Sequence, residues 1–439
     1  MTKTLIRGRL LSFKRAPLSL TDTDSYAYEH DGGLLIEDGV ITAIGDYAKV
    51  QAGAPEDVEE IDHRPHLILP GLIDTHMHFP QMQVIASYAG SLLEWLNTYT
   101  FHEECRFVES GHAARIATHF YDELLRHGTT TAAAYCSVHK TSADAFFAEA
   151  MRRGMCMVGG KVMMDRNAPQ GLLDTPQAGY DETRAVIAEW HGKGRNHVAI
   201  TPRFAITSTP EQMQAAQTLA AEFPNLHIQT HLSENHDEIR YTCELFPEAK
   251  DYTDIYARYG LLGKKTLLGH AIHLSDRETD VLSETGSVAV HCPTSNLFIG
   301  SGLFPLSAIR RREKPVRVAV ATDIGGGSSY SMLRTLDEAY KIQQILGERL
   351  NPLDSFHLMT RGNAEALSLE GRIGTLDIGT DADLVVLDAG ATPAMKLRLE
   401  TVTTLPEELF LLQTMGDDRA VAQTYVAGKA MKPRPAKDG

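Results

Sequence analysis

Cysteine is scarce in this chain of 439 residues, which has only five cysteines and no Cys-x-x-Cys pair. An odd number of widely spaced cysteines argues against a disulfide framework and is typical of reduced thiols in the cytoplasm. No second cysteine follows the Cys292–Pro293 pair. This excludes the kind of zinc site that is built on a Pro-Cys-x-x-Cys motif.

Basic residues are also in deficit, with 42 Lys and Arg against 57 Asp and Glu and a formal net charge of −15. Such a surface repels the phosphates of nucleic acids and anionic membranes. No stretch of about 18 apolar residues is present to cross a membrane, and the N-terminal segment lacks the apolar core of a secretion signal. We therefore expect a cytoplasmic protein that acts on small molecules, with no nucleic-acid or membrane partner.

The centre of the chain contains a long series of short apolar strands that alternate with amphipathic helices. The predicted helices include 110–127, 210–222 and 331–346. The predicted strands are 72–76, 131–136, 156–163, 198–204, 227–231, 266–270, 287–292 and 316–323. This alternation predicts an α/β fold with a parallel sheet, most simply a TIM-type (β/α)8 barrel, and a doubly wound open sheet is the alternative.

Both ends of the chain are rich in short strands. Asp38-Gly39 lies between two apolar runs, which is typical of a β-hairpin, and a second pair of runs turns near Gly428. Neither end is large enough to be stable alone. We therefore expect residues 1–67 and 371–439 to form one small β-sandwich domain beside a barrel domain of residues 68–370.

The strongest chemical signal is the segment 70–78, PGLIDTHMH, in which His76 and His78 are two residues apart. Residues i and i+2 of a strand point to the same face, so both imidazoles project the same way. In a barrel the carboxyl ends of the strands form the mouth of the active site, where two histidines provide half of a zinc site. For this motif taken alone, two solvated loop histidines are the alternative.

Three further predicted strands end in residues that bind metals or transfer protons, namely His231, His270 and Asp323. Singly, each is better explained as a cap or a hydrogen-bonded rim residue. Gathered at one rim with the His-x-His pair, they offer imidazoles and a carboxylate. This donor set suits Zn²⁺ or Fe²⁺ with one position open for water.

Glu234 lies three residues after His231 in the segment THLSEN. A carboxylate just past a metal ligand can accept a proton from water and pass it to a substrate. Without the histidines, we would instead interpret Glu234 as an exposed residue at the start of a helix. The predicted fourth strand ends at Arg203 and Phe204, with no Lys or Glu there to bridge a second metal. This favours a single metal ion.

The chain resembles the amidohydrolase superfamily in the PGLIDTHMH segment, the strand-end residues and the β-rich flanks. Within it, the chain is similar to the branch that deaminates guanine. The segments that carry this similarity are 75–81 (THMHFPQ), 91–101 (SLLEWLNTYTF), 202–204 (PRF), 230–235 (THLSEN), 291–297 (HCPTSNL) and 321–333 (ATDIGGGSSYSML). The resemblance implies a metal-dependent hydrolase that converts guanine and water to xanthine and ammonia in purine catabolism.

The resemblance also assigns metal-binding and catalytic roles. It implies one zinc ion per subunit, with iron as the alternative, bound by His76, His78, His231 and Asp323. It implies that His270 hydrogen-bonds the attacking water, that Glu234 shuttles protons, and that Asp323 also helps to orient the nucleophile.

For the purine, the resemblance implies that Gln81 offers its amide to the ring edge and that Arg203 donates to the carbonyl oxygen. His231 also lines the substrate site, and Phe204 and Trp95 pack on the ring. Without the resemblance, Gln81, Arg203 and Trp95 would be assigned to ordinary loop and rim packing. A homodimer is implied as well.

Two alternatives stay open. Another amidohydrolase, acting on an s-triazine, a pterin or an adenosine-type thioether, would share the metal residues and use Gln81 and Arg203 for a different ring. A barrel that binds without catalysis is the second, but such proteins usually lose metal ligands, and none of the expected ligands is missing here.

Overall fold

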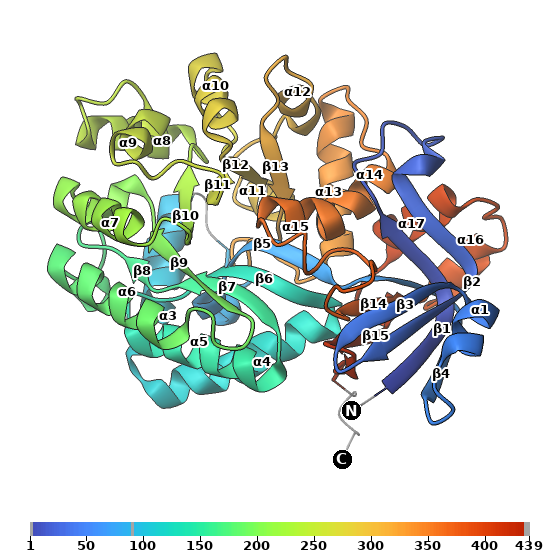
Figure 1. Ribbon diagram of the computed structural model, residues 1–439. Coiled ribbons are helices and arrows are strands. Elements are labelled where there is room, and N and C mark those ends of the chain that lie inside the picture. The colour runs from blue at the N-terminus through green and yellow to red at the C-terminus, as the bar shows by residue number, and fades with distance from the viewer. Residues whose placement is uncertain (1–2, 89–91, 434–439) are drawn as a thin grey trace.

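The computed structural model describes residues 3–88 and 92–433. It contains a parallel barrel surrounded by helices and a second sheet beside it (Figure 1). Residues 1–2 and 434–439 of the predicted β domain, and Ser91 of the segment 91–101, lie outside the described residues.

Eight parallel strands follow one another around a nearly closed barrel, which confirms the (β/α)8 prediction over the open sheet. In hydrogen-bonded order they are β5 (Leu72–His78), β6 (Thr129–Tyr135), β7 (Cys156–Gly160), β9 (Asn196–Pro202), β10 (His227–Leu232), β11 (Thr266–His270), β12 (Val288–His291) and β13 (Arg317–Val320). β8 (Val162–Met163) also pairs with β9, so the predicted strand 156–163 is divided at Lys161. β5 and β6 are buried along their whole length, as expected for parallel strands covered on both faces.

Side chains close the barrel between its first strand, β5, and its last, β13. Asp74 accepts hydrogen bonds from the backbone N–H of Thr322 at 3.2 Å and from its hydroxyl at 2.5 Å. Asn363 donates to the carbonyl oxygens of Ile73 and Val320 at 2.7 and 2.8 Å. These buried contacts fix the two strands that end next to His76 and Asp323.

Helices surround the barrel strands. They are α2 (Leu92–Trp95), α3 (Phe101–Cys105), α4 (Ser110–Arg126), α5 (Lys140–Arg153), α6 (Pro176–Trp190), α7 (Pro210–Glu222), α8 (His236–Leu245), α9 (Tyr252–Arg258), α10 (Asp276–Thr285), α11 (Pro293–Phe298), α12 (Leu306–Arg310), α13 (Met332–Ile345), α14 (Pro352–His357) and α15 (Asn363–Ala366). α7 has the predicted bounds because Thr209 caps it, accepting from the N–H of Gln212, and Pro210 begins it. α4 buries one face that includes Ile116 and Phe120 against the barrel core.

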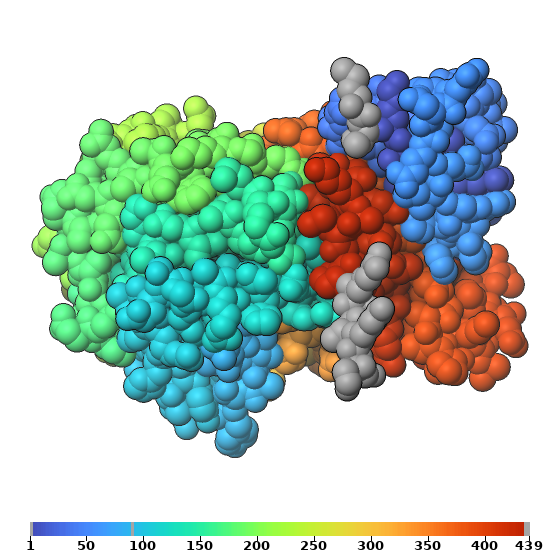
Figure 2. Space-filling model, turned by 90° about the horizontal axis from the view of Figure 1, so that it is seen from below, coloured from blue at the N-terminus to red at the C-terminus, as the bar shows by residue number. Residues whose placement is uncertain are grey.

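The two ends of the chain build a second sheet of seven strands, as predicted. Its order is β16 (Lys429–Ala430), β15 (Val421–Val426), β14 (Leu384–Leu387), β4 (Glu59–Pro70), β1 (Lys3–Phe13), β2 (Tyr26–Glu37) and β3 (Val40–Asp46). The predicted hairpin at Asp38-Gly39 is present, and both residues have positive φ (50° and 85°) as a tight turn of this kind requires. Ile6, Ile68 and Val386 share an apolar core. Figure 2 shows the first and last parts of the chain side by side.

Three helices accompany this sheet. α1 (Tyr47–Gly53) packs on β2, and α16 (Pro393–Leu399) and α17 (Leu405–Met415) lie between β14 and β15 in the sequence. α17 packs on α13 and α14 of the barrel, so the C-terminal segment contacts both parts of the molecule. The division into a domain of 1–67 with 371–439 and a domain of 68–370 stays a prediction.

One residue, Gly71, joins the two sheets, because β4 ends at Pro70 and β5 begins at Leu72. A Cβ atom at position 71 would lie 2.1 Å from the hydroxyl oxygen of Thr130. Only glycine allows this close approach, and Gly71 also donates its N–H to Asp383 O at 2.8 Å. The strand that carries the His-x-His pair is thus anchored directly to the second sheet.

Candidate active site

The five metal-capable residues predicted from the sequence meet at the carboxyl ends of the barrel strands. His76 and His78 project from β5, and His231 projects from β10. His270 is the last residue of β11, and Asp323 follows β13. Their exposures lie between 0% and 8%. Parallel strands end at one rim, which is why residues far apart in the sequence come together.

The spacing of the donor atoms suits a metal ion. Nε2 of His78 lies 3.1 Å from Nε2 of His231, and Asp323 Oδ1 lies 3.4 Å from Nε2 of both His76 and His78. Tetrahedral coordination with bonds of about 2.1 Å places its donors about 3.4 Å apart. The four side chains are therefore close to the positions that such coordination requires.

Unpaired ring nitrogens point to the same conclusion. His76 is fully buried, yet neither of its ring nitrogens has a hydrogen-bond partner within residues 3–88 and 92–433, and the same is true of Nδ1 of His78. Buried polar atoms without partners are rare and costly. The residues present fit a divalent metal ion, which supplies a partner for nitrogens that the protein itself leaves without one.

The protonation states also suit a cation. Burial lowers the pKa of His76, and it lowers the pKa values of His78 and His231 well below the usual range. Burial alone would raise the pKa of Asp323, but the nearby imidazole of His76 and the charge of His270 outweigh it and lower this pKa to about 2. Neutral imidazoles and an ionised carboxylate are the forms that bind metals.

Backbone and amide groups orient two of the rings. Nδ1 of His231 donates to the carbonyl oxygen of Arg203 at 2.7 Å, which leaves Nε2 free to face His78. Nδ1 of His270 donates to the amide oxygen of Asn296 at 2.8 Å. A partner of this kind fixes the tautomer and the plane of an imidazole. The HCPTSNL segment thus contributes Asn296, a role that its sequence did not reveal.

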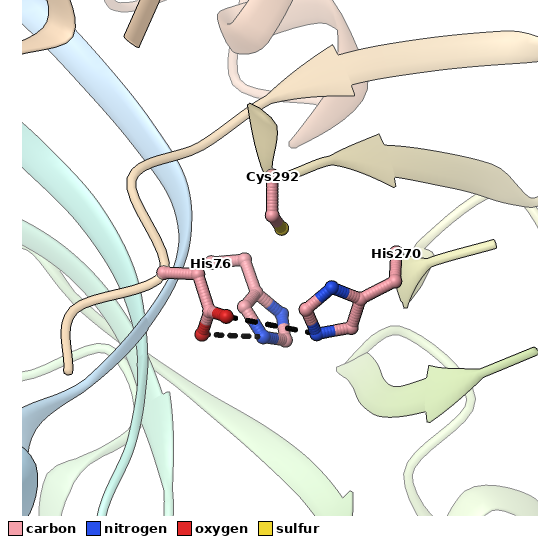
Figure 3. Close-up of side chains that lie close together, drawn as sticks. His76, His270 and Cys292 are labelled. Carbon is pink, nitrogen blue, oxygen red and sulfur yellow. Dashed lines mark ion pairs between the residues drawn. The ribbon is translucent and has the colours of Figure 1, made fainter. Parts of the chain in front are cut away.

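Cys292 lies in the same cluster, although the sequence gave no signal for it. Its sulfur and donor atoms of His76, His270 and Asp323 all lie within 4.8 Å of one another. Figure 3 shows Cys292 pointing toward His76 and His270 from a third strand end. Burial raises the pKa of this thiol well above its usual range, so it stays protonated. A protonated thiol is a poor metal ligand, and the set with His78 and His231 fits better.

Glu234 is buried beside this cluster and precedes α8, so the alternative of an exposed residue at a helix start does not apply. Its Oε1 accepts from the hydroxyl of Ser301 at 2.7 Å, and its Oε2 lies 3.5 Å from Nε2 of His270. Burial raises the pKa of Glu234, and the charge of His270 opposes the rise. The carboxylate is therefore held in place at one oxygen and faces the histidine cluster with the other.

The cluster forms one side of a cavity, whose lining includes His78, His231, His270 and Asp323. Besides His231, its lining residues include the other four that the sequence predicted for the purine, namely Gln81, Trp95, Arg203 and Phe204. Each of these four is at most 5% exposed. Small-molecule sites are concave, largely apolar and fitted with a few placed polar groups. The cavity has this composition, with metal-capable side chains at one end.

Glu104 connects the two polar residues of the cavity and was not predicted. Both of its carboxylate oxygens accept from Nη1 of Arg203, at 2.9 and 2.7 Å. Oε1 also accepts from Nε2 of Gln81 at 2.8 Å. Glu104 lies three residues after the end of the recognised segment 91–101. Nothing in its position in the sequence indicated a role.

Comparison with known proteins gives consistent matches. The model of the Amidohydrolase family matches residues 67–431. A guanine deaminase of Escherichia coli strain K12 is 45% identical over 404 residues, which cover 92% of each chain. The solved structure of an E. coli guanine deaminase is 42% identical with a TM-score of 0.96, and the match covers 98% of this chain and 100% of that one. A guanine deaminase structure from C. acetobutylicum with bound guanine is 28% identical, with a TM-score of 0.86 and the same coverage.

Two further observations concern the expected setting of the protein. Among the described residues, no helix is long and apolar enough to span a membrane. All five cysteines are free thiols, and three of them are buried.

Proposed function

The chain belongs to the amidohydrolase family, and we propose that it hydrolyses guanine to xanthine and ammonia. The observation that carries the proposal is the 45% identity to a guanine deaminase across nearly the whole of both chains. The chain is a hydrolase that acts on a carbon–nitrogen bond of a small purine. The cavity beside the histidine cluster has the polar groups that such a substrate requires.

His76, His78, His231 and Asp323 are the residues that would hold the metal ion. Three neutral imidazoles with one carboxylate suit Zn²⁺, and Fe²⁺ is the second candidate. Bound there, a divalent cation lowers the pKa of a water molecule toward ~7 and so provides a nucleophile at neutral pH.

A single metal ion is favoured because β9 ends at Pro202 and is followed by Arg203 and Phe204, which do not bridge metal ions. The buried Lys161 lies at the break between β7 and β8 and donates to Asp174 at 2.7 Å. Its charge is therefore engaged outside the cavity, in keeping with one ion per subunit.

Glu234 is the proton carrier of the proposed reaction. Its carboxylate accepts a proton from the attacking water and delivers it to N3 of the purine, while the water oxygen forms a bond to C2. The same carboxylate then accepts the proton of the new C2 hydroxyl group and delivers it to the departing 2-amino group, so that the C2–N bond breaks and ammonia leaves. Ser301 keeps one oxygen in place during these transfers, and His270 hydrogen-bonds the attacking water.

The purine is held by the polar and aromatic side chains of the cavity. Arg203 donates to the carbonyl oxygen at C6, and Gln81 offers its amide to the ring edge. Phe204 packs on the ring from the side of His231, whose imidazole lies edge-on to it at 6.0 Å between ring centroids. Trp95 covers the ring from α2. A charged donor matched to a localised acceptor gives orientation as well as affinity.

Two features of the protein's setting are also proposed. A homodimer follows from the family resemblance. A cytoplasmic location is supported by the five free cysteines.

A substrate panel tests the proposal. Purified, zinc-loaded protein is assayed for ammonia release from guanine, adenine, cytosine, a pterin and an s-triazine. Clear preference for guanine is expected. Ammonia release from a pterin or the triazine alone would be consistent with a hydrolase that uses the histidine cluster. It would overturn the assignment of Gln81 and Arg203 to purine binding.

A further inference from the structure

The carboxylate of Glu104 is one of the most buried charges of the protein, with 1% of the residue exposed. It lies in α3 behind the wall of the cavity, not on its lining. It receives Nη1 of Arg203 and Nε2 of Gln81. A buried carboxylate that engages the two polar residues of a binding cavity, without touching its contents, acts on the ligand only through them.

Glu104 fixes which way the Gln81 amide faces. Nε2 of Gln81 donates to Glu104, and Oε1 of Gln81 accepts from the N–H of Gly325 at 3.3 Å. A carboxylate only accepts and a backbone N–H only donates, so the reversed amide would meet an unfavourable partner at both ends. One N–H and one lone pair of Gln81 remain for the cavity, in fixed positions.

Glu104 also decides how Arg203 is presented. Both contacts of the guanidinium with the carboxylate come from Nη1. The guanidinium lies over the ring of Phe101, 5.5 Å from its centroid, which restricts its tilt. The remaining N–H groups are therefore directed by the ion pair and the aromatic ring together. Removing the carboxylate would leave a buried cation unpaired and free to turn.

We propose that Glu104 is a positioning residue that holds Arg203 and Gln81 in the orientation that recognises a purine carbonyl. It thereby sets the preference for a 6-oxo purine over a 6-amino purine. The proposal rests on the proposed function, because it assumes that guanine occupies this cavity. A fixed donor matches the oxygen of guanine at C6 and opposes an amino group there, which also donates.

The neighbouring Glu103 provides a matched control. It lies on the same helix and is 7% exposed. Its carboxylate accepts from Arg106 at 2.6 Å and from His112 at 2.9 Å, so it is paired on the side of the helix away from the cavity. Glu103→Gln therefore reproduces the loss of one buried charge from α3 without altering the purine-binding side chains.

The experiment compares Glu104→Gln, Glu103→Gln and the unaltered holoenzyme with two substrates, guanine and 2,6-diaminopurine. Both carry a 2-amino group, but the second has an amino group at C6. Glu104→Gln is expected to raise KM for guanine about 10–100-fold, as loss of a residue that orients a ligand-binding group commonly does. We expect kcat for guanine to change far less and the metal content to stay equal. The ratio of kcat/KM for guanine to that for 2,6-diaminopurine is expected to fall by at least the factor by which KM rises. Glu103→Gln is expected to match the unaltered enzyme.

A double-mutant comparison identifies the route of the effect. In the Arg203→Met background, Glu104→Gln is expected to change KM much less than it does alone, because its main partner is absent. If Glu104→Gln does not fold, Glu104→Asp keeps the charge but withdraws it by one methylene group. That variant is expected to raise KM by a smaller factor.

Unchanged KM and unchanged substrate preference in the soluble Glu104 variant would overturn the proposal. Equal effects of Glu103→Gln and Glu104→Gln would also overturn it, since the role would then be structural. Failure of the unaltered enzyme to release ammonia from guanine would instead overturn the proposed function, so the two failures are distinguishable.

Discussion

Replacing Asp74 by alanine tests whether side chains at the barrel seam hold the metal-binding rim together. The Asp74 carboxylate accepts from the backbone N–H groups of His76 and Thr322, at 3.3 and 3.2 Å, and from the hydroxyl of Thr322 at 2.5 Å. Alanine leaves these three buried donors without their acceptor, at the point where β5 and β13 meet.

The expected loss of stability follows from these contacts. Each buried donor left without a partner costs roughly 1–2 kcal/mol, or about 3–6 kcal/mol for the three. Burial raises the pKa of Asp74 itself to about 7, so the carboxyl group is costly to bury and its removal offsets part of the loss. We therefore expect Asp74→Ala to lower the free energy of unfolding by about 3 kcal/mol. For a chain of 439 residues, an unfolding entropy of roughly 2.1 cal/mol/K per residue converts this to a fall of about 3 °C in Tm.

Thermal unfolding followed by circular dichroism, with metal content measured on the same samples, checks this value. Asp74→Asn keeps one acceptor oxygen and is expected to lose roughly half as much stability. Asp62→Ala removes an exposed carboxylate that pairs with Arg64, and there we expect no measurable change. A Tm for Asp74→Ala equal to that of Asp62→Ala would refute the argument that Asp74 closes the barrel.

Three further predictions concern activity and pH. Glu234→Gln is expected to retain metal and to lose turnover by about 10²–10⁴-fold, measured as ammonia release, and a near-normal rate would remove Glu234 from the mechanism. Arg203→Met is expected to impair guanine turnover more than metal content, and equal loss of both would assign Arg203 a structural role. Burial lowers the pKa values of His227 and His357 to about 4, so below pH 6.5 the unfolded chain takes up protons that the native state refuses. The stability that these two neutral histidines contribute is therefore fully present above about pH 6.5 and is lost as the pH drops toward 4. The loss reaches about 3 kcal/mol for each group at the end of that range. Tm measured from pH 7.5 to 5 checks the direction, and a Tm that stays level would contradict it.

The barrel and its rim were predictable because their signals are local and repeated. Apolar strands that end in His, Asp or Arg recur along the central part of the chain, and parallel strands must bring such ends to one edge. His76, His231 and Asp323 could therefore be grouped before their distances were known. The hairpin at Asp38-Gly39 was equally plain, since few sequences satisfy two consecutive positive φ angles.

Residues that act through tertiary contacts gave no such signal. Glu104 follows a recognised segment, but a glutamate on a short helix is ordinarily solvated, and only the fold places Arg203 and Gln81 against it. Ser301 and Asn296 likewise matter because of what they touch. The break at Lys161 depends on its pairing with Asp174 from a later loop, which no strand pattern encodes.

The seam between the first and last barrel strands has a consequence for the order in which the protein is made. The proposed ligands run from His76 to Asp323, and Asp323 donates its N–H to the carbonyl oxygen of His76 at 2.9 Å. β4, which leads into the His-x-His strand, also needs β14 at residues 384–387 as its neighbour. A chain still on the ribosome therefore carries histidines but no complete coordination site until most of its length has emerged. With the proposed ligands, metal binding would follow the synthesis of most of the chain, and a product truncated before residue 323 would lack one of the four ligands.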